Sequence, residues 1–139
     1  MKFSNKLETK ASREIIWKIW TDVENWAIWD TELKESKLET EFKLGAKGSL
    51  IPKKGLKAAF EITELKDGES YAFTTKLPLA ELKVRRFFSE KKDKTEFVHE
   101  VSFSGFLGGL WGIILGGTFK AVLPKVMENL KNLAEQKSK

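Results

Sequence analysis

The chain has 139 residues, of which 41% are hydrophobic and 32% charged, and its formal net charge is +5. This length and this balance predict one globular domain with a sizeable core, which excludes a disordered chain. The sequence contains no cysteine, which excludes disulfide bonds, thiolate metal sites and cysteine nucleophiles.

Lysine and arginine are spread along the chain and interleaved with glutamate, without a block of five or six like charges. This pattern is typical of a solvated surface, so we expect no nucleic-acid partner. The N-terminal residues lead into an alternating pattern rather than an apolar core, so we expect no signal peptide and a cytoplasmic protein. The longest apolar stretch, 106–119, is short and rich in glycine, so we expect no transmembrane segment there.

The first part of the chain predicts one strand and two short helices. Residues 3–10 alternate between apolar and polar side chains, which is typical of a strand. Ser12 can cap a first helix that carries an isoleucine-rich face. Thr21-Asp22-Val23-Glu24 has the spacing of a capping box, so a second helix should start there.

Residues 32–104 alternate with a period of two and are interrupted by turn signals. Glycine or proline marks turns at 44–48, 52–55, 67–68 and 77–79, and a charged run marks another at 91–94. Short strands joined by tight turns predict antiparallel hairpins rather than crossover units. This part of the chain should therefore form a sheet with one apolar face.

The C-terminal region changes to a helical period. Phe119, Val122 and Val126 begin an apolar stripe that continues to residue 133, and polar side chains lie opposite it. The stripe extends back to about Leu107, so Pro124 should kink the helix from inside. A sheet and a helix that each have one apolar face must cover each other, which predicts an α+β domain spanning residues 1–139.

Several segments resemble a known superfamily. Residues 20–30, Trp-Thr-Asp-Val-Glu-Asn-Trp-Ala-Ile-Trp-Asp, are similar to the signature of the polyketide cyclase/dehydrase and lipid-transport group of the START-like, birch-pollen-allergen-like superfamily (SRPBCC), although Thr31 stands where proline is common. Residues 44–48, 101–105 and 123–130 resemble the glycine turn of that group and its entry into the final helix. The resemblance implies a helix-grip fold, in which seven antiparallel strands wrap around the long C-terminal helix.

The turns also predict which side chains meet on the inner face of the sheet. A two-residue loop at Asp67-Gly68 would place Glu64 opposite Tyr71. Two-residue turns at Pro78-Leu79 and Lys92-Asp93 extend the pairing across two more strands. Three inner rows result: Glu64/Tyr71/Arg86/His99, Ile62/Phe73/Val84/Val101 and Phe60/Thr75/Leu82/Phe103.

One of these rows is polar and two are largely apolar, as in many small-molecule sites. The polar row has two interpretations. Its members either form a structural network that satisfies buried polar groups, or they orient a ligand. His99 is the only histidine and is a weak candidate for a general acid or base.

The tryptophans also have two interpretations. Trp20 and Trp26 should pack the short helices on the sheet, whereas Trp29 and Trp111 are candidates for the mouth of a cavity. The stretch 106–117 could be a lid, an edge in transient contact with a membrane, or a helix start whose glycines permit close packing.

We expect no metal site and no cofactor, because the sequence lacks metal-ligand spacing, a phosphate loop and a dinucleotide fingerprint. The candidate ligand-binding residues are Trp29, Phe60, Ile62, Glu64, Tyr71, Phe73, Leu82, Val84, Arg86, His99, Val101, Phe103, Trp111, Phe119, Val122 and Val126.

Three functions remain open, because the superfamily includes binders of lipids, sterols, polyketides and hormones as well as cyclases and proteins that assist other proteins. The first is the binding or carrying of a hydrophobic small molecule or lipid between the sheet and the helix. The second is an enzyme of the cyclase/dehydrase kind that uses Tyr71, Arg86 and His99. The third is an interaction protein with a filled core.

Overall fold

The computed structural model describes residues 1–91 and 93–139. Its elements follow in the order β1 (Lys2–Thr9), α1 (Arg13–Thr21), the 3-10 helix η1 (Val23–Ile28), β2 (Leu33–Leu38), β3 (Lys47–Pro52), β4 (Ala58–Lys66), β5 (Ser70–Leu77), β6 (Ala80–Phe88), β7 (Thr95–Ser104) and α2 (Gly108–Lys137).

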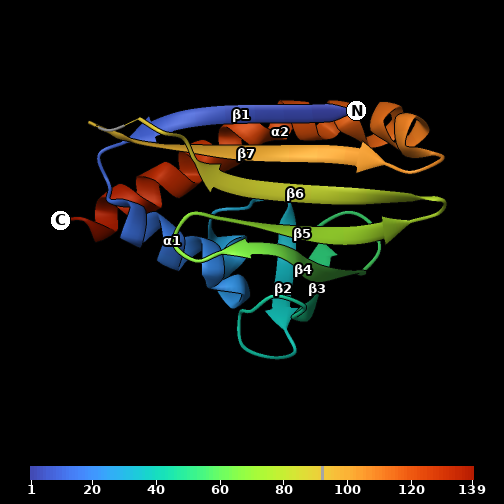
Figure 1. The fold of residues 1–139 in the computed structure, drawn as a ribbon, viewed down its shortest axis with the longest axis horizontal. Helices are drawn as coiled ribbons and strands as arrows, with labels where there is room; N and C mark the ends of the chain where they lie inside the picture. The colour runs from blue at the N-terminus through green and yellow to red at the C-terminus, as the bar shows by residue number, and fades with distance from the viewer. Residues whose placement is uncertain (92) are drawn as a thin grey trace.

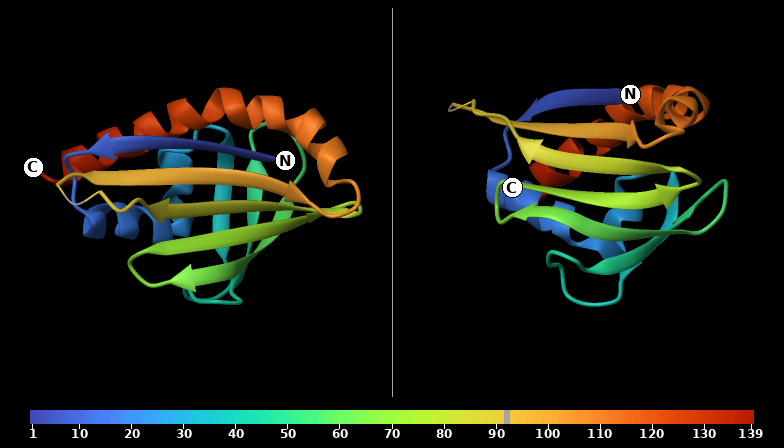
Figure 2. Two further views of the ribbon diagram at one scale, coloured as in Figure 1. Left: turned by 45° about the horizontal axis from the view of Figure 1, so that its top comes forward. Right: turned by 45° about the vertical axis from the view of Figure 1, so that its right-hand side comes forward.

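The seven strands form one antiparallel sheet in the order β1-β7-β6-β5-β4-β3-β2. Figure 1 shows β2 and β3 running across the direction of β5, β6 and β7, so the sheet curves strongly. The helix α2 lies along β1 and β7, and α1 and η1 close one end of the concave face (Figure 2). The predicted α+β helix-grip fold is confirmed.

The two short helices are present, but only one of them begins as predicted. Ser12 caps α1, because its hydroxyl accepts a hydrogen bond from the Ile15 amide at 3.3 Å. The capping box predicted at Thr21 was wrong. Thr21 is the last residue of α1 and its hydroxyl donates to the Trp17 carbonyl at 3.0 Å, while η1 begins at Val23 without a side-chain cap.

The registers of two hairpins agree with the alternation of the sequence. Across β5 and β6, Tyr71 pairs with Arg86, and across β6 and β7, Arg86 pairs with His99. Leu79 completes the tight β5–β6 turn in the left-handed region, with φ of 55°. The predicted centre of the β6–β7 turn includes Lys92, which lies outside the described residues.

The β4–β5 register corrects one prediction. Lys66 pairs with Ser70, so the loop is one residue longer than a two-residue turn, and Gly68 adopts a φ of 73° within it. An irregularity between Ile62 and Glu64 restores the predicted pairing of Ile62 with Phe73. Leu65, rather than Glu64, therefore faces Tyr71, and Glu64 turns to the outer face.

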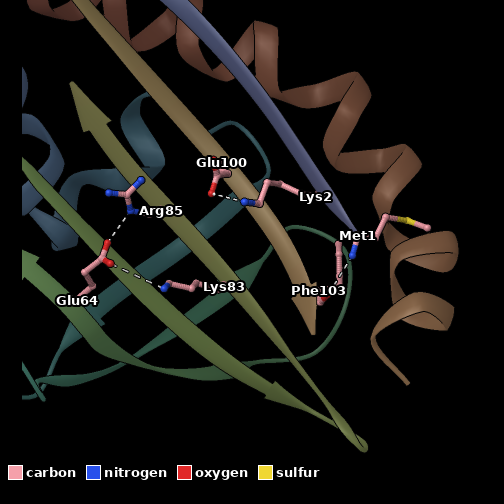
Figure 3. Close-up of polar contacts among 7 residues, drawn as sticks. All are labelled: Met1, Lys2, Glu64, Lys83, Arg85, Glu100 and Phe103. Carbon is pink, nitrogen blue, oxygen red and sulfur yellow. Dashed lines mark hydrogen bonds and ion pairs between the residues drawn. The ribbon is translucent and has the colours of Figure 1, made fainter. Parts of the chain in front are cut away.

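Figure 3 shows the outer position of Glu64. Its carboxylate accepts a hydrogen bond of 2.7 Å from Arg85 Nε, and Lys83 lies 4.0 Å away. Lys2 and Glu100 form a second pair on the same face, with 3.6 Å between their charged atoms. These ions are partly exposed, so they belong to the solvated side of the sheet.

The helix α2 begins at Gly108, close to the predicted start, and continues through Pro124 as a single element. Figure 2 shows it bowed over the sheet. Gly112 and Gly116 lie on one face of the helix, where an added methyl group would overlap Met1 and Phe3, at the start of the chain. The glycines therefore permit close packing of helix on sheet, as one of the sequence interpretations proposed.

The core is densest between α1, η1 and the nearer end of the sheet. Trp20 and Trp26 are fully buried there, as predicted, and Trp26 stacks on Phe60 with 5.7 Å between the ring centroids. Met127 and Leu130 of α2 close the same region from the other side. These contacts hold the inner polar row in place from three directions.

Candidate functional site

The inner polar row is made of Leu65, Tyr71, Arg86 and His99, one residue from each of four adjacent strands. It lies on the concave face toward the end that α1 and η1 close, beneath Trp20, Trp26 and Trp29. Tyr71, Arg86 and His99 are buried, so every polar atom in the row needs a partner from the protein or from a ligand.

Arg86 carries a buried positive charge, with only 4% of its surface exposed. No ion pair joins it to a carboxylate of the residues that the structure describes. Its guanidinium carbon lies 4.8 Å from the ring centre of Trp26, 4.9 Å from that of Trp29 and 5.2 Å from that of Phe73. The faces of aromatic rings attract a cation, so these rings supply part of the stabilisation that a carboxylate would give.

Tyr71 links Arg86 to the first helix. Arg86 Nη1 donates to the Tyr71 hydroxyl at 2.6 Å, and that hydroxyl donates to the Trp20 carbonyl at 3.1 Å. Burial raises the pKa of Tyr71, while the nearby charge of Arg86 lowers it by a smaller amount. The phenol is therefore neutral at physiological pH and serves as both donor and acceptor.

His99 accepts a hydrogen bond at Nε2 from the Trp20 indole, at 3.1 Å. Burial first, and the charge of Arg86 second, hold the pKa of His99 well below its usual 6.5. The ring is neutral, with its proton on Nδ1, because Nε2 acts as an acceptor. His99 therefore packs and orients the Trp20 ring, and its Nε2 is not free to take a proton from a bound molecule.

Two buried N–H groups of the described residues have no acceptor, namely Arg86 Nε and Trp29 Nε1. Both belong to side chains that are in contact, as the cation–ring distance of 4.9 Å shows. A buried donor without a partner costs about 1–3 kcal/mol. The two N–H groups and the unpaired charge of Arg86 lie together in the interior. An anionic or carbonyl oxygen bound there would stabilise them.

Asp30 is an acidic group that this charge affects. Burial raises the pKa of its carboxyl, and Arg86 opposes that rise. Its Oδ1 accepts a hydrogen bond from the Glu32 amide at 3.1 Å, which turns the carboxylate toward the start of β2. Asp30 therefore moderates the positive potential near Arg86 without forming an ion pair with it.

On β5 and β6, the inner side chains become less buried from Tyr71 and Arg86 toward the turn that joins these strands. Tyr71 is 0% exposed, whereas Phe73 is 5%, and Val84 and Thr75 are 8% exposed. Leu82, one row further, is only half-buried. The apolar side chains of this region that remain partly exposed are Leu50, Leu77, Leu82, Trp111, Leu115, Phe119 and Val122.

The structure thus brings most of the predicted residues together. Phe60, Ile62, Val101, Phe103 and Val126 are buried around the polar row or beside it. Trp29, expected at a cavity mouth, is buried beside Arg86, because η1 turns its ring inward. Trp111 is partly buried, and its indole donates to the Pro78 carbonyl at 3.0 Å. Glu64 does not join the group, because the irregularity in β4 turns it to the outer face.

Three residues shape the candidate site in ways that were not predicted from the sequence. Leu65 takes the place predicted for Glu64. Trp20 provides hydrogen bonds as well as packing, and Asp30 adjusts the potential. The glycine at position 68 was the available signal for the first of these, since a left-handed residue also fits a longer hairpin loop.

Two hollows are found on the surface of the described residues, and both lie outside the space between the sheet and α2. The larger, of about 1060 Å³, is an open polar groove that includes Glu8, Lys91, Lys94 and Glu135. The smaller, of about 340 Å³, lies beside Ile15 and Lys18 of α1. The described residues contain no group of three or more histidine, aspartate or glutamate side chains placed to hold a metal ion.

Comparison with known proteins agrees with this architecture. Residues 1–135 match the family model described as polyketide cyclase / dehydrase and lipid transport. The chain belongs to this family. No curated protein sequence matches it.

Solved structures of the same fold include TTHA0849 from Thermus thermophilus, at 12% identity and a TM-score of 0.76, with both chains fully covered. The di-domain aromatase/cyclase StfQ of the steffimycin biosynthetic pathway is 11% identical, with a TM-score of 0.77 over 99% of this chain and 51% of StfQ. Norcoclaurine synthase from Thalictrum is 9% identical, with a TM-score of 0.72 over 100% of this chain and 96% of the enzyme. At these identities the likeness concerns the fold.

Proposed function

We propose that the protein binds or carries a hydrophobic small molecule or lipid that has a carboxylate at one end. The acceptor would meet Arg86 Nε and Trp29 Nε1, two buried N–H groups that lack a partner among the described residues. This pair of donors is the observation that carries the proposal, since their cost is removed when an acceptor arrives.

The apolar part of the ligand would extend from Arg86 toward the β5–β6 turn. Leu82 lies four residues from Arg86 on the same strand, which corresponds to about 13 Å. Along this path the inner side chains of β5 and β6 keep a small exposure that Tyr71 lacks. Opening it requires rotation of Leu82, Phe119 and their partly exposed neighbours rather than unfolding of an element.

Binding is preferred over catalysis because of the state of His99. A general base must be able to accept a proton from the reacting group, and His99 Nε2 already accepts from Trp20. Its lowered pKa also keeps the ring in its neutral form near neutral pH, so no imidazolium is present to act as a general acid. The partial exposure of the apolar path favours binding over an interaction protein whose core is filled.

Native mass spectrometry of the purified protein, compared with its mass after denaturation, is the first test. A discrete excess mass that disappears on denaturation supports the proposal and gives the class of ligand. The second test uses 11-(dansylamino)undecanoic acid and its methyl ester as fluorescent probes. The acid should bind at least about tenfold more tightly, since a charge-assisted hydrogen bond contributes roughly 1.5–3 kcal/mol.

A matched pair of variants locates the donor. Arg86→Met should remove the preference for the acid, whereas Arg85→Met, a change on the outer face of the same strand, should preserve it. Trp29→Phe removes one N–H group and keeps an aromatic ring, so it tests the site even where Arg86→Met folds poorly. Equal binding of acid and ester to the natural protein, or equal losses in both arginine variants, would contradict the proposal.

A further inference from the structure

Large apolar side chains are exposed mainly at one end of the molecule. Seven of the nine such residues on the described surface lie there, all except Ile28 and Leu44. Phe106 and Leu56 are each 90% exposed, and Ile113 is 72% exposed. We call this group the apolar end, and its members are Met1, Leu56, Leu79, Phe106, Leu110, Ile113 and Ile114.

The topology explains why these residues share an end. Antiparallel pairing places the start of β4, the β5–β6 turn, the end of β7 and the start of β1 at the same edge, as the right-hand side of Figure 1 shows. The Leu107 amide donates to the Leu79 carbonyl at 2.9 Å, and the Met1 ammonium donates to the Phe103 carbonyl at 3.2 Å. The apolar end is therefore built from connections that are fixed to one another.

The helix α2 presents two different faces in this region. Gly112 and Gly116 meet the first strand, whereas Gly109 and Gly117 have no neighbouring atoms on the other side. Ile113 and Ile114 project from the uncovered part. By length and composition α2 is apolar enough to cross a membrane, yet only 28% of its most apolar 18-residue window is buried in the structure.

Basic residues outnumber acidic ones around the apolar end, where Glu81 lies opposite Lys76 beside the β5–β6 turn and Glu32 lies beside Lys53. Segments 1–7, 42–60, 70–80 and 101–127 contain no aspartate or glutamate. Within them, Lys53, Lys54 and Lys57 surround Leu56, and Lys76 precedes the β5–β6 turn. No ion pair in the described chain involves these four lysines. Their charges are therefore free to meet an external anion.

We propose that the apolar end docks on the surface of an anionic lipid bilayer. Phe106, Leu110 and Ile113 enter the boundary between headgroups and acyl chains, while the lysines remain among the headgroups. Apolar side chains beside an excess of basic residues fit such a surface. A protein partner of ordinary composition would present both charge signs, and one sign would be repelled.

Docking is separate from the binding of a small molecule. It depends on exposed residues at the apolar end, whereas the proposed ligand meets Arg86 in the interior. Either proposal can therefore fail without the other. Flotation of the natural protein with vesicles tests docking directly, because no dissolved ligand is needed.

The experiment compares vesicles of phosphatidylcholine alone with vesicles that contain about one-third phosphatidylglycerol. We expect the protein to float with the anionic vesicles at low salt and to remain mostly unbound with the neutral ones. The triple change Lys53→Gln, Lys54→Gln and Lys57→Gln should weaken binding about 100-fold, from roughly fivefold for each lysine. The control variant changes Lys10, Lys18 and Lys137 to glutamine, so it has the same net charge as the triple variant. These three lysines are exposed and lie away from the apolar end, so the control should keep most of its binding.

A second pair of variants tests the apolar contribution. Phe106→Ser with Ile113→Ser should lower binding at least about tenfold, because each buried methylene contributes roughly 0.8 kcal/mol. Ile28→Ser with Leu44→Ser removes comparable exposed apolar surface elsewhere and should bind normally. All these positions are exposed, so the folded state should persist in each variant.

Three results would overturn the proposal. The first is a failure of the natural protein to float with anionic vesicles at low salt. The second is an equal loss in the two lysine variants, which would indicate a response to net charge alone. The third is a concentration-dependent dimer, detected by sedimentation, that dissociates when Phe106 and Ile113 are changed, because the apolar end would then bind a second copy of the chain.

Discussion

The Arg86 guanidinium and the Tyr71 hydroxyl form a buried hydrogen bond of 2.6 Å across β5 and β6. The same hydroxyl donates to the Trp20 carbonyl, so one oxygen joins the sheet to the first helix. This relationship gives the charge of Arg86 a polar neighbour in an interior otherwise lined by aromatic rings. It also leaves Arg86 Nε without an acceptor, which is the basis of the proposed ligand site.

The change Tyr71→Phe should lower the free energy of unfolding by about 1–3 kcal/mol. It removes the acceptor of Arg86 and the donor to Trp20 while keeping the ring, so the cost is mainly that of unsatisfied buried groups. Urea denaturation measures the effect. Thr63→Val is the matched control, because the Thr63–Thr74 hydrogen bond is exposed, and its effect should stay within about 0.5 kcal/mol. Similar effects of both changes would show that the buried network contributes little.

The stability of the protein should fall as the pH decreases below 6.5. In the unfolded chain His99 gains a proton near pH 6.5, whereas in the folded chain its pKa is held well below that value. Between the two pKa values the unfolded state binds more protons, which costs the folded state up to about 1.4 kcal/mol per pH unit. Above pH 6.5 both states are neutral at this residue and the effect is absent.

His99→Gln isolates this contribution. Glutamine can still accept the Trp20 N–H but does not titrate, so the variant should lose the slope between pH 5 and 6.5 that the natural protein shows in urea denaturation. Carboxylate groups titrate in both proteins and cancel in the comparison. A folded-state NMR titration that gives His99 an ordinary pKa would refute the explanation.

The two glycine faces of α2 predict opposite effects on stability. Gly116→Ala should destabilise the protein by about 1–3 kcal/mol, because the new methyl group would overlap the Phe3 ring. Gly117→Ala meets nothing within contact distance and should stabilise the helix by about 0.5–1 kcal/mol, since alanine has the higher helix propensity. Thermal unfolding of both variants provides the comparison, and equal shifts would argue against close packing of α2 on β1.

Glu64→Gln should have a small effect, within about 1 kcal/mol, although Glu64 lies near the middle of the sheet. Its ion pairs with Arg85 and Lys83 are partly exposed, and such pairs contribute little. Binding of the dansyl acid should be unchanged, because the carboxylate is on the outer face. A large loss of binding in this variant, measured against Thr63→Val, would mean that Glu64 faces the interior after all.

The alternation of residues 70–104 was enough to predict the β5–β6 and β6–β7 registers, including the pairs Tyr71–Arg86 and Arg86–His99. It succeeded because a one-residue slip would turn every apolar side chain to the solvent. The position of Glu64 could not be predicted, because a longer loop at Gly68 and an irregularity before Glu64 change the register over only a few residues. Local alternation looks nearly the same with or without such a bulge.

The sequence by itself determined the class of fold and the direction in which most strand side chains point, since both follow from the periodicity of apolar residues. Only the tertiary structure decided that Trp29 turns inward onto Arg86, and that Leu56, Leu79 and Phe106 meet at one end. Those positions depend on connections between elements, whose direction is fixed by contacts between residues far apart in the chain. Periodicity reports which face a residue occupies, and packing alone decides which residue it meets there.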